Sequence, residues 1–151
     1  MEPQRSILKH NRKIFYKILN HYTLDQLNKV PEGFNNSIFW NVTHCIVIQQ
    51  RLMYLLSGNN IRIDQKWLDK YDKGTFPDMP AINKDLADVK KLLFSTLDSL
   101  DKDTQTTIFN KFFSFTTSTN QLIDDFDSAF TFVIFHDGLH LGSILAIRKF
   151  V

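Results

Sequence analysis

The chain has a single cysteine, and this scarcity excludes one common way of stabilising a fold. Cys45 has no second thiol to pair with among the 151 residues, so no disulfide forms within the chain. A chain of this length buries about 70% of its unfolded surface on folding and needs no covalent cross-link. A lone thiol among apolar residues is typical of a buried packing residue in a reducing compartment, and we expect a cytoplasmic protein.

Signal-peptide and membrane features are also scarce. The first residues carry charge at Glu2 and Arg5 with no apolar segment behind them, so we expect no signal peptide. No apolar run reaches membrane-spanning length, and we expect no membrane partner.

The chain has little excess of charge of either sign. A formal net charge of +2 is too small to indicate nucleic-acid binding. Lys9, Arg12, Lys13 and Lys17 do cluster, but their spacing is typical of one solvated helix face. We therefore expect no nucleic-acid partner.

Apolar residues at helical spacing, by contrast, are abundant. They recur every three to four positions over four long stretches, which turn residues such as Pro31 and Gly33 separate. These stretches predict one helix over residues 5–28, a second from a cap at Asn35 or Asn36 through Leu56, a third from about Ile82 to Asp101, and a last one after a cap at Asp125 or Asp127.

Two long connections complete the predicted fold. Residues 61–80 contain a short amphipathic piece around Trp67 and Leu68. Lys102–Asn120 is rich in Thr, Ser and Phe, and for this segment we expect a helix followed by a loop, although its pattern does not decide between them. The whole pattern predicts an all-α protein, an antiparallel four-helix bundle with long connections that occupies residues 1–151 as one domain.

The second predicted helix is apolar nearly all round. One stripe runs through Asn41, His44 and Ile48, while Val42 and Cys45 cover another side. Such a helix must be buried by neighbours on several sides. We expect a homodimer, because one bundle core covers fewer faces than this helix presents.

Three histidines suggest a metal site. His136 and His140, in the sequence HDGLH, are four residues apart and therefore project from the same face of the last helix. Two imidazoles at that spacing can bind one transition-metal ion. His44 lies within an apolar helix, where an imidazole needs a polar partner, and it is the natural third ligand.

Two further residues are candidates for catalysis. Asp137 could accept a proton from metal-bound water, hold a ligand imidazole, or lie on the surface, and adjacent helical residues point ~100° apart. Asn41 lies one turn before His44 and could line the ligand pocket or bond within the bundle. HDGLH also looks like a variant of the HExxH zinc-protease motif, but the chain offers neither the substrate-binding strands nor the downstream ligand of such a protease.

The chain resembles the DinB-like (damage-inducible B) superfamily of metal-binding four-helix bundles. The resemblance spans almost the whole chain. It rests on Leu27 through Pro31 with Gly33, on Asn36, Ser37, Ile38, Trp40 and His44, on Leu56, Ser57 and Gly58, on Gly74, Thr75, Phe76 and Pro77, and on His136, Gly138, His140 and Gly142.

This resemblance implies a divalent ion, often zinc or nickel, bound by His44, His136 and His140. It also implies a protein that is often a dimer, in a superfamily that includes metal-dependent hydrolases and thiol-dependent S-transferases. The chain departs from the family pattern at two positions. Asp137 stands where glutamate is common, and Asn41 stands where a second histidine is often found.

Three neutral imidazoles leave a tetrahedral ion with one open position, where water or a thiol could be activated. We therefore expect an enzyme that acts on a small-molecule substrate, with a low-molecular-weight thiol or water as the activated group, in a pocket lined by Asn41, Phe132 and the connection near Phe76. The alternatives are a protein that binds a metal, a small molecule or a partner without chemistry, and a scaffold with a degenerate site that holds no metal.

Overall fold

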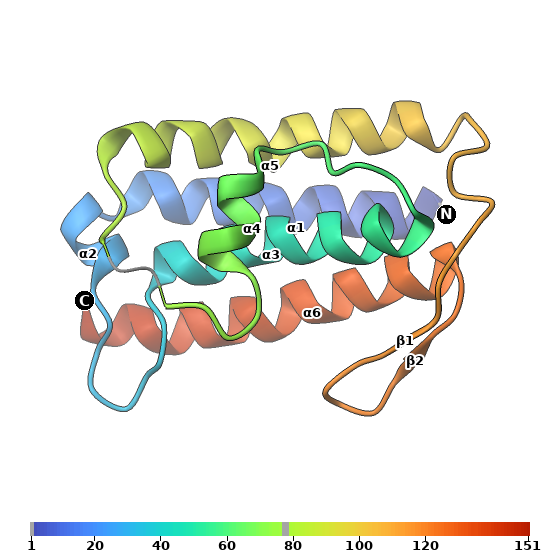
Figure 1. The fold of residues 1–151 in the computed structure, drawn as a ribbon. Coiled ribbons are helices and arrows are strands. Elements are labelled where there is room, and N and C mark those ends of the chain that lie inside the picture. The colour runs from blue at the N-terminus through green and yellow to red at the C-terminus, as the bar shows by residue number, and fades with distance from the viewer. Residues whose placement is uncertain (1, 77–78) are drawn as a thin grey trace.

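Four long helices form the body of the molecule (Figure 1). The computed structural model describes residues 2–76 and 79–151, so Pro77, one of the residues that carry the resemblance, lies outside the described part. The long helices are α1 (Glu2–His21), α3 (Ile38–Met53), α5 (Asn83–Asp103) and α6 (Phe126–Ile147). The shorter elements are α2 (Leu24–Asn28), η1 (Leu55–Ser57), α4 (Gln65–Tyr71), β1 (Phe115–Thr116), β2 (Leu122–Ile123) and η2 (Arg148–Phe150). The all-α prediction is confirmed.

The helix directions differ in part from a fully antiparallel bundle. α3 packs antiparallel to α6, and α1 packs antiparallel to α5, but α3 and α5 run in the same direction (Figure 1). The reason is the connection between η1 and α5, whose described part carries the chain back along the bundle before α5 begins (Figure 1). α4 lies across α3 within this connection and places Trp67, Leu68 and Tyr71 in the core.

Local capping decides where the helices begin and end. The predicted helix over residues 5–28 is interrupted after His21, because Thr23 caps α2 in a capping box with Gln26. The cap of α3 is Ser37 rather than Asn35 or Asn36, since the Ser37 hydroxyl accepts a hydrogen bond from the Trp40 N–H at 3.1 Å.

The segment before α6 also differs from expectation. α5 continues to Asp103, and the remainder of Lys102–Asn120 contains turns and β1 rather than a further helix. β1 and β2 form a short antiparallel hairpin whose turn includes Asn120 at a φ of 64°. After the hairpin, Asp125 caps α6, as predicted, by accepting a hydrogen bond from the Ser128 N–H at 2.7 Å.

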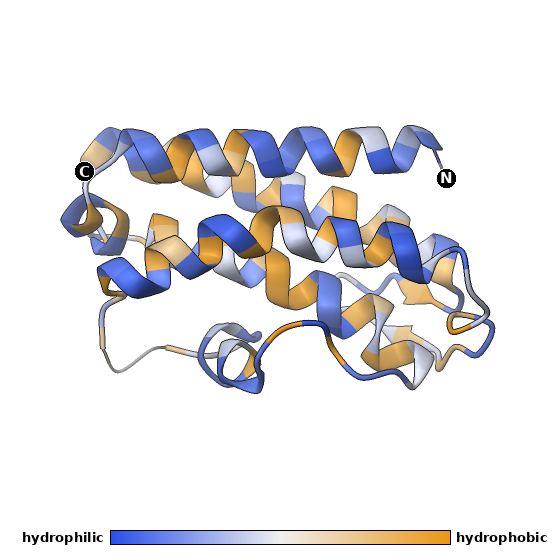
Figure 2. Ribbon diagram, turned by 90° about the horizontal axis from the view of Figure 1, so that it is seen from above, coloured by the Kyte–Doolittle hydropathy of each residue, from blue (hydrophilic) through white to orange (hydrophobic). Residues whose placement is uncertain are grey.

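α3 is the central helix of the bundle. Every one of its residues except Arg51 is buried, and α2, α4, α5 and α6 of the same chain pack around it. Figure 2 shows the corresponding pattern on the outer helices, whose hydrophobic residues gather on one face while hydrophilic residues cover the other. The connections therefore cover the faces for which we expected a second subunit, and the apolar character of α3 no longer argues for a dimer.

α6 corrects the expectation that no apolar run reaches membrane-spanning length. Phe126–Phe150 is long and apolar enough to cross a membrane by length and composition, and 28% of its apolar stretch is buried in the protein. One side of α6 packs against α3 and α1. Its other side exposes apolar residues, which are Phe135, Leu139 and Leu145.

Candidate metal centre

The antiparallel pair α3 and α6 brings three histidines together. His44 lies in the middle of α3, and His136 and His140 lie one turn apart on the facing side of α6. One ring nitrogen from each histidine lies within 4.8 Å of those of the other two, and the Nε2 atoms of His136 and His140 are 3.2 Å apart. We call these three side chains the histidine cluster.

Hydrogen bonds fix which nitrogen of two of these rings carries the proton. The Nδ1 of His44 lies 2.6 Å from the backbone carbonyl of Tyr71, which can only accept, so Nδ1 donates and Nε2 keeps a lone pair. The Nδ1 of His140 lies 2.7 Å from Oδ1 of Asn41. The amide nitrogen of Asn41 donates to the carbonyl of Ser37, so its oxygen faces His140 and leaves the Nε2 lone pair of that ring free.

Burial keeps the cluster neutral. Loss of water lowers the pKa of His44, while its hydrogen bond to Tyr71 acts in the opposite direction. Burial and the neighbouring rings of His140 and His44 lower the pKa of His136 to about 2, and burial together with His44 lowers that of His140 to about 4. All three rings are therefore uncharged near neutral pH, with one ring nitrogen free of a proton, which is the state that binds metals.

These residues fit a divalent transition metal. Three neutral imidazoles are a donor set suited to zinc and nickel. Two of the rings are held from behind by a carbonyl or an amide, the arrangement that orients histidine ligands. Nε2 of His136 lies 3.2 Å from the Nε2 lone pair of His140, and no described residue bonds its buried Nδ1. A cation between these nitrogens would satisfy the converging lone pairs.

Aromatic side chains enclose the cluster. The indole of Trp40 stacks on the His44 ring with centroids 4.4 Å apart and planes 16° apart. Trp40 precedes His44 by one helical turn, a spacing that could have identified it from the sequence. The Tyr71 carbonyl could not have been found in this way, because it comes from α4 in the long connection and belongs to the backbone.

Asp137 lies apart from the pocket. Its carboxylate is fully buried 3.7 Å from the guanidinium of Arg12 on α1, which is also fully buried. Arg12 was expected on a solvated helix face, but it donates instead to Oε1 of Gln49 and to the carbonyl of Cys45. Burial raises the pKa of Asp137 to about 6, although Arg12 opposes this shift. We call Arg12 and Asp137 the inner charged pair.

The two predicted catalytic residues therefore have different surroundings. A carboxylate oxygen of Asp137, the sulfur of Cys45 and one ring nitrogen of His136 lie within 4.8 Å of one another, so Asp137 sits behind a ring of the cluster. This position favours a supporting role over proton transfer in the pocket. Asn41 is 4% exposed and bonds within the bundle while it orients His140.

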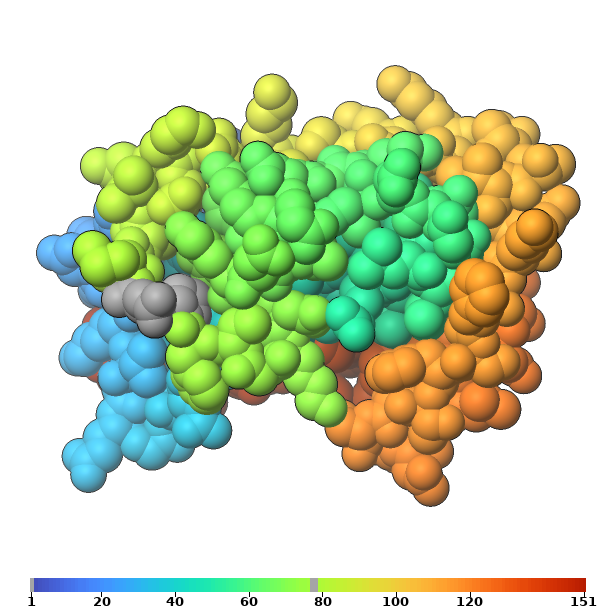
Figure 3. All heavy atoms as spheres, viewed as in Figure 1, coloured from blue at the N-terminus to red at the C-terminus, as the bar shows by residue number. Residues whose placement is uncertain are grey.

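A pocket of about 290 Å³ leads to the histidine cluster. Its walls come from α3, α6, the segment after α4 and the β1–β2 hairpin. Figure 3 shows a hollow between the green segment after α4 and the orange hairpin, with α6 in red at its floor. Phe132 lines the pocket, as predicted. From the connection after α4, Lys73 lines the pocket, and not Phe76 as predicted. Phe76 lines a neighbouring hollow with Trp40 and Tyr71.

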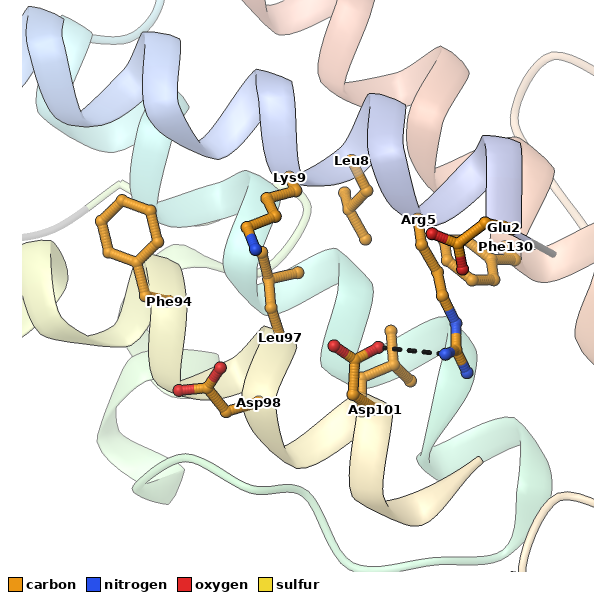
Figure 4. Close-up of a pocket in the computed structure, with 10 residues that line it drawn as sticks. Glu2, Arg5, Leu8, Lys9, Phe94, Leu97, Asp98, Asp101 and Phe130 are labelled. Carbon is orange, nitrogen blue, oxygen red and sulfur yellow. Dashed lines mark ion pairs between the residues drawn. The ribbon is translucent and has the colours of Figure 1, made fainter. Parts of the chain in front are cut away.

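A second hollow lies between α1 and α5 and has a volume of about 170 Å³. Figure 4 shows that Arg5 of α1 reaches toward Asp101 of α5 across it, and the two charged groups are 3.4 Å apart. Glu2, Lys9 and Asp98 also line it, so its charges are mixed. None of the three clustered histidines reaches this hollow.

Comparison with known proteins supports the same site. A family profile described as the DinB superfamily matches residues 7–144, a range that contains all three clustered histidines. No curated protein matches the chain significantly. The family match and the histidine cluster are compatible with a metal-binding protein. The chain belongs to the DinB superfamily.

Proposed function

We propose that the protein is a metal-dependent enzyme that activates a thiol for transfer to a small-molecule substrate. One observation carries the proposal: three imidazoles, each with a ring nitrogen within 4.8 Å of those of the other two, meet at the base of a pocket, and none of the described residues that line this pocket is acidic. Zinc or nickel is the divalent ion we propose for this site.

The absence of an acidic residue from the described lining favours a thiol over water as the activated group. A divalent ion with an open position lowers the pKa of the group it binds, whether water or thiol. Metal-dependent hydrolysis gains further rate from a base that takes up a proton from the attacking water. Asp137 is the nearest carboxylate to the cluster that the geometry identifies, and it faces Arg12. A thiolate is a nucleophile without further proton transfer.

The chain's own residues then have distinct roles. His44, His136 and His140 hold the ion, while Asn41 and the Tyr71 carbonyl fix the orientation of two rings. The apolar walls limit water in the pocket, and a drier site strengthens electrostatic interactions with a bound thiolate.

The test is turnover by zinc- or nickel-loaded protein. Low-molecular-weight thiols paired with small electrophiles form one panel, and esters and amides form the other. We expect consumption of thiol and electrophile together. Ester or amide cleavage without a thiol would overturn the choice of thiol over water. Metal binding without turnover in either panel would leave a non-catalytic binding protein.

The homodimer and the cytoplasmic location remain part of the proposal. With α3 enclosed, the surface that remains for a second copy is the outer face of α6, where Phe135, Leu139 and Leu145 are exposed. Gly138 and Gly142 lie between them one turn apart, with open space where a Cβ would stand, so another helix could approach closely. Sedimentation equilibrium of the wild type and of Leu145→Glu, whose side chain does not line the pocket, tests this interface.

A further inference from the structure

The pocket above the histidine cluster has a deep end and an exposed end of different character. His44 at the deep end is 4% exposed, whereas Lys73 and Ser118 at the other end are exposed to solvent. Apolar side chains line the length between them, and these are Ile48, Leu52, Phe115, Phe132 and Leu139. A ligand that fills the pocket therefore needs an apolar body.

The charge at the exposed end is positive. Arg51 and Lys73 line the pocket, and no described lining residue is acidic. The nearby carboxylate of Asp72 is already occupied: one oxygen pairs with Arg51 at 2.7 Å, and the other accepts the backbone N–H of Lys73 at 2.8 Å. In the described part of the chain no ion pair involves the ammonium group of Lys73. The charged group at the exposed end that has no ion-pair partner among the described residues is thus the ammonium of Lys73.

Hydroxyl groups of the β1–β2 hairpin line the same pocket as Lys73. Thr117, Ser118 and Thr119 form the turn of the β1–β2 hairpin and line the same pocket. The hydroxyls of Thr117 and Thr119 bond to each other at 3.0 Å, and Thr117 also accepts from the Gln121 N–H. The Ser118 hydroxyl makes no hydrogen bond with any described residue, so it can donate to a ligand.

We infer that the pocket takes a ligand with an apolar chain and a carboxylate at its outer end, recognised by Lys73 and the Ser118 hydroxyl. The inference rests on the proposed function for the identity of the reacting end, which lies at the histidines. The preference for an anion depends on the exposed end of the pocket and does not depend on the reaction at the histidines. A single ammonium with one hydroxyl suits a singly charged group, because an ammonium is a compact point charge.

The test compares three ligands of equal chain length that differ only in their end group: octanoate, octanol and octylamine. Their dissociation constants are measured by NMR titration of the zinc-loaded protein at low salt. We expect octanoate to bind about three- to tenfold more tightly than octanol, and octylamine to bind most weakly. The amide signals of Lys73 and Ser118 should shift with octanoate, and high salt should reduce its advantage.

Two variants isolate the role of the mouth. Lys73→Met should abolish the advantage of octanoate and leave the binding of octanol unchanged, while Lys91→Met, at an exposed lysine of α5, should change neither. A carboxylate that coordinated the metal directly would keep its advantage in Lys73→Met, and that result would overturn the inference. Equal binding of octanoate and octanol by the wild type would overturn it too. The dissociation constants and amide shifts involve neither a thiol nor turnover. Failure of the proposed reaction would therefore show in the turnover assay and not in this one.

Discussion

His136 and Asp137 are neighbours on α6, yet they belong to two polar regions with opposite properties. The His136 ring meets two other neutral imidazoles at the base of a pocket, whereas the Asp137 carboxylate is sealed beside the guanidinium of Arg12. Adjacent helical residues point ~100° apart, so one turn of helix serves both regions. A ligand can reach the histidine cluster through the pocket, but it cannot reach the buried Arg12–Asp137 pair.

The two regions avoid the cost of buried charge differently: the histidine rings are neutral, and the inner pair combines opposite charges. Burial lowers the pKa values of the histidines, so they avoid mutual repulsion and keep their lone pairs. Arg12 and Asp137 instead offset one another's charge. Substitutions in the histidine cluster should therefore change metal binding, and substitutions in the inner charged pair should change stability.

Alanine at His44, His136 or His140 should have the largest effect, which is loss of the bound metal. Each variant loses one of the three ligand bonds outright, and two imidazoles bind an ion far more weakly than three. Plasma emission on dialysed protein should find about one ion per chain in the wild type and almost none in each variant. His10→Ala on the exposed side of α1 is the control, and it should retain the metal. Full metal content in all three variants would contradict the site.

Breaking the inner charged pair should have the next largest effect. Arg12→Met leaves the Asp137 carboxylate buried without its cation, which costs about 3–5 kcal/mol in the free energy of unfolding. The double variant Arg12→Met, Asp137→Leu removes both charges and should regain much of this loss. Urea denaturation measures the free energies. If folded Arg12→Met lost its metal as completely as the histidine variants, the separation of the two regions would be wrong.

Asn41→Ala should weaken metal binding without abolishing it. The Nδ1 of His140 then loses its acceptor, and loss of such a partner lowers metal affinity by roughly 10- to 100-fold. Competition with a coloured zinc chelator measures the affinity. Asn41→Asp keeps an oxygen at this position and should recover most of it, a rescue that a purely structural role for Asn41 does not predict.

The last predicted effect is the dependence of the free energy of unfolding on pH in metal-free protein. The folded-state pKa values of His140 and His136 are about 4 and about 2 against an ordinary value of 6.5, so the unfolded chain binds more protons between pH 6.5 and about 4. The free energy of unfolding should fall as the pH is lowered through this range. Asp137, with its pKa raised to about 6 from 3.8, acts in the opposite direction and offsets part of the loss. Urea denaturation in the presence of a chelator measures the slope, and His140→Gln should make it shallower.

Much of this comparison could be predicted from the sequence. Four-residue spacing placed His136 and His140 on one face, and the apolar surroundings of His44 marked it as a residue in need of a partner. The divergence of Asp137 from the ligands also follows from helix geometry alone. These inferences depend on short-range periodicity, which a single sequence records well.

Other features depend on which helices become neighbours, and periodicity does not record that. Arg12 lies among lysines in the sequence, and only the packing of α1 beside α3 and α6 shows that it is buried against Asp137. The sequence likewise does not show that α4 packs on α3, so the apolar surface of α3 led us to expect a second subunit. The hairpin wall of the pocket was missed because its strands are too short to show an alternating pattern.

The central claim is that the histidine cluster binds a metal with one position open to the pocket, while the inner charged pair supplies no ligand. X-ray absorption at the zinc edge tests this most directly, before and after addition of a low-molecular-weight thiol. We predict three imidazole nitrogens at about 2.0–2.1 Å in both states, and one new sulfur at about 2.3 Å after the thiol is added. A spectrum that shows four protein ligands and does not change with the thiol would contradict the claim.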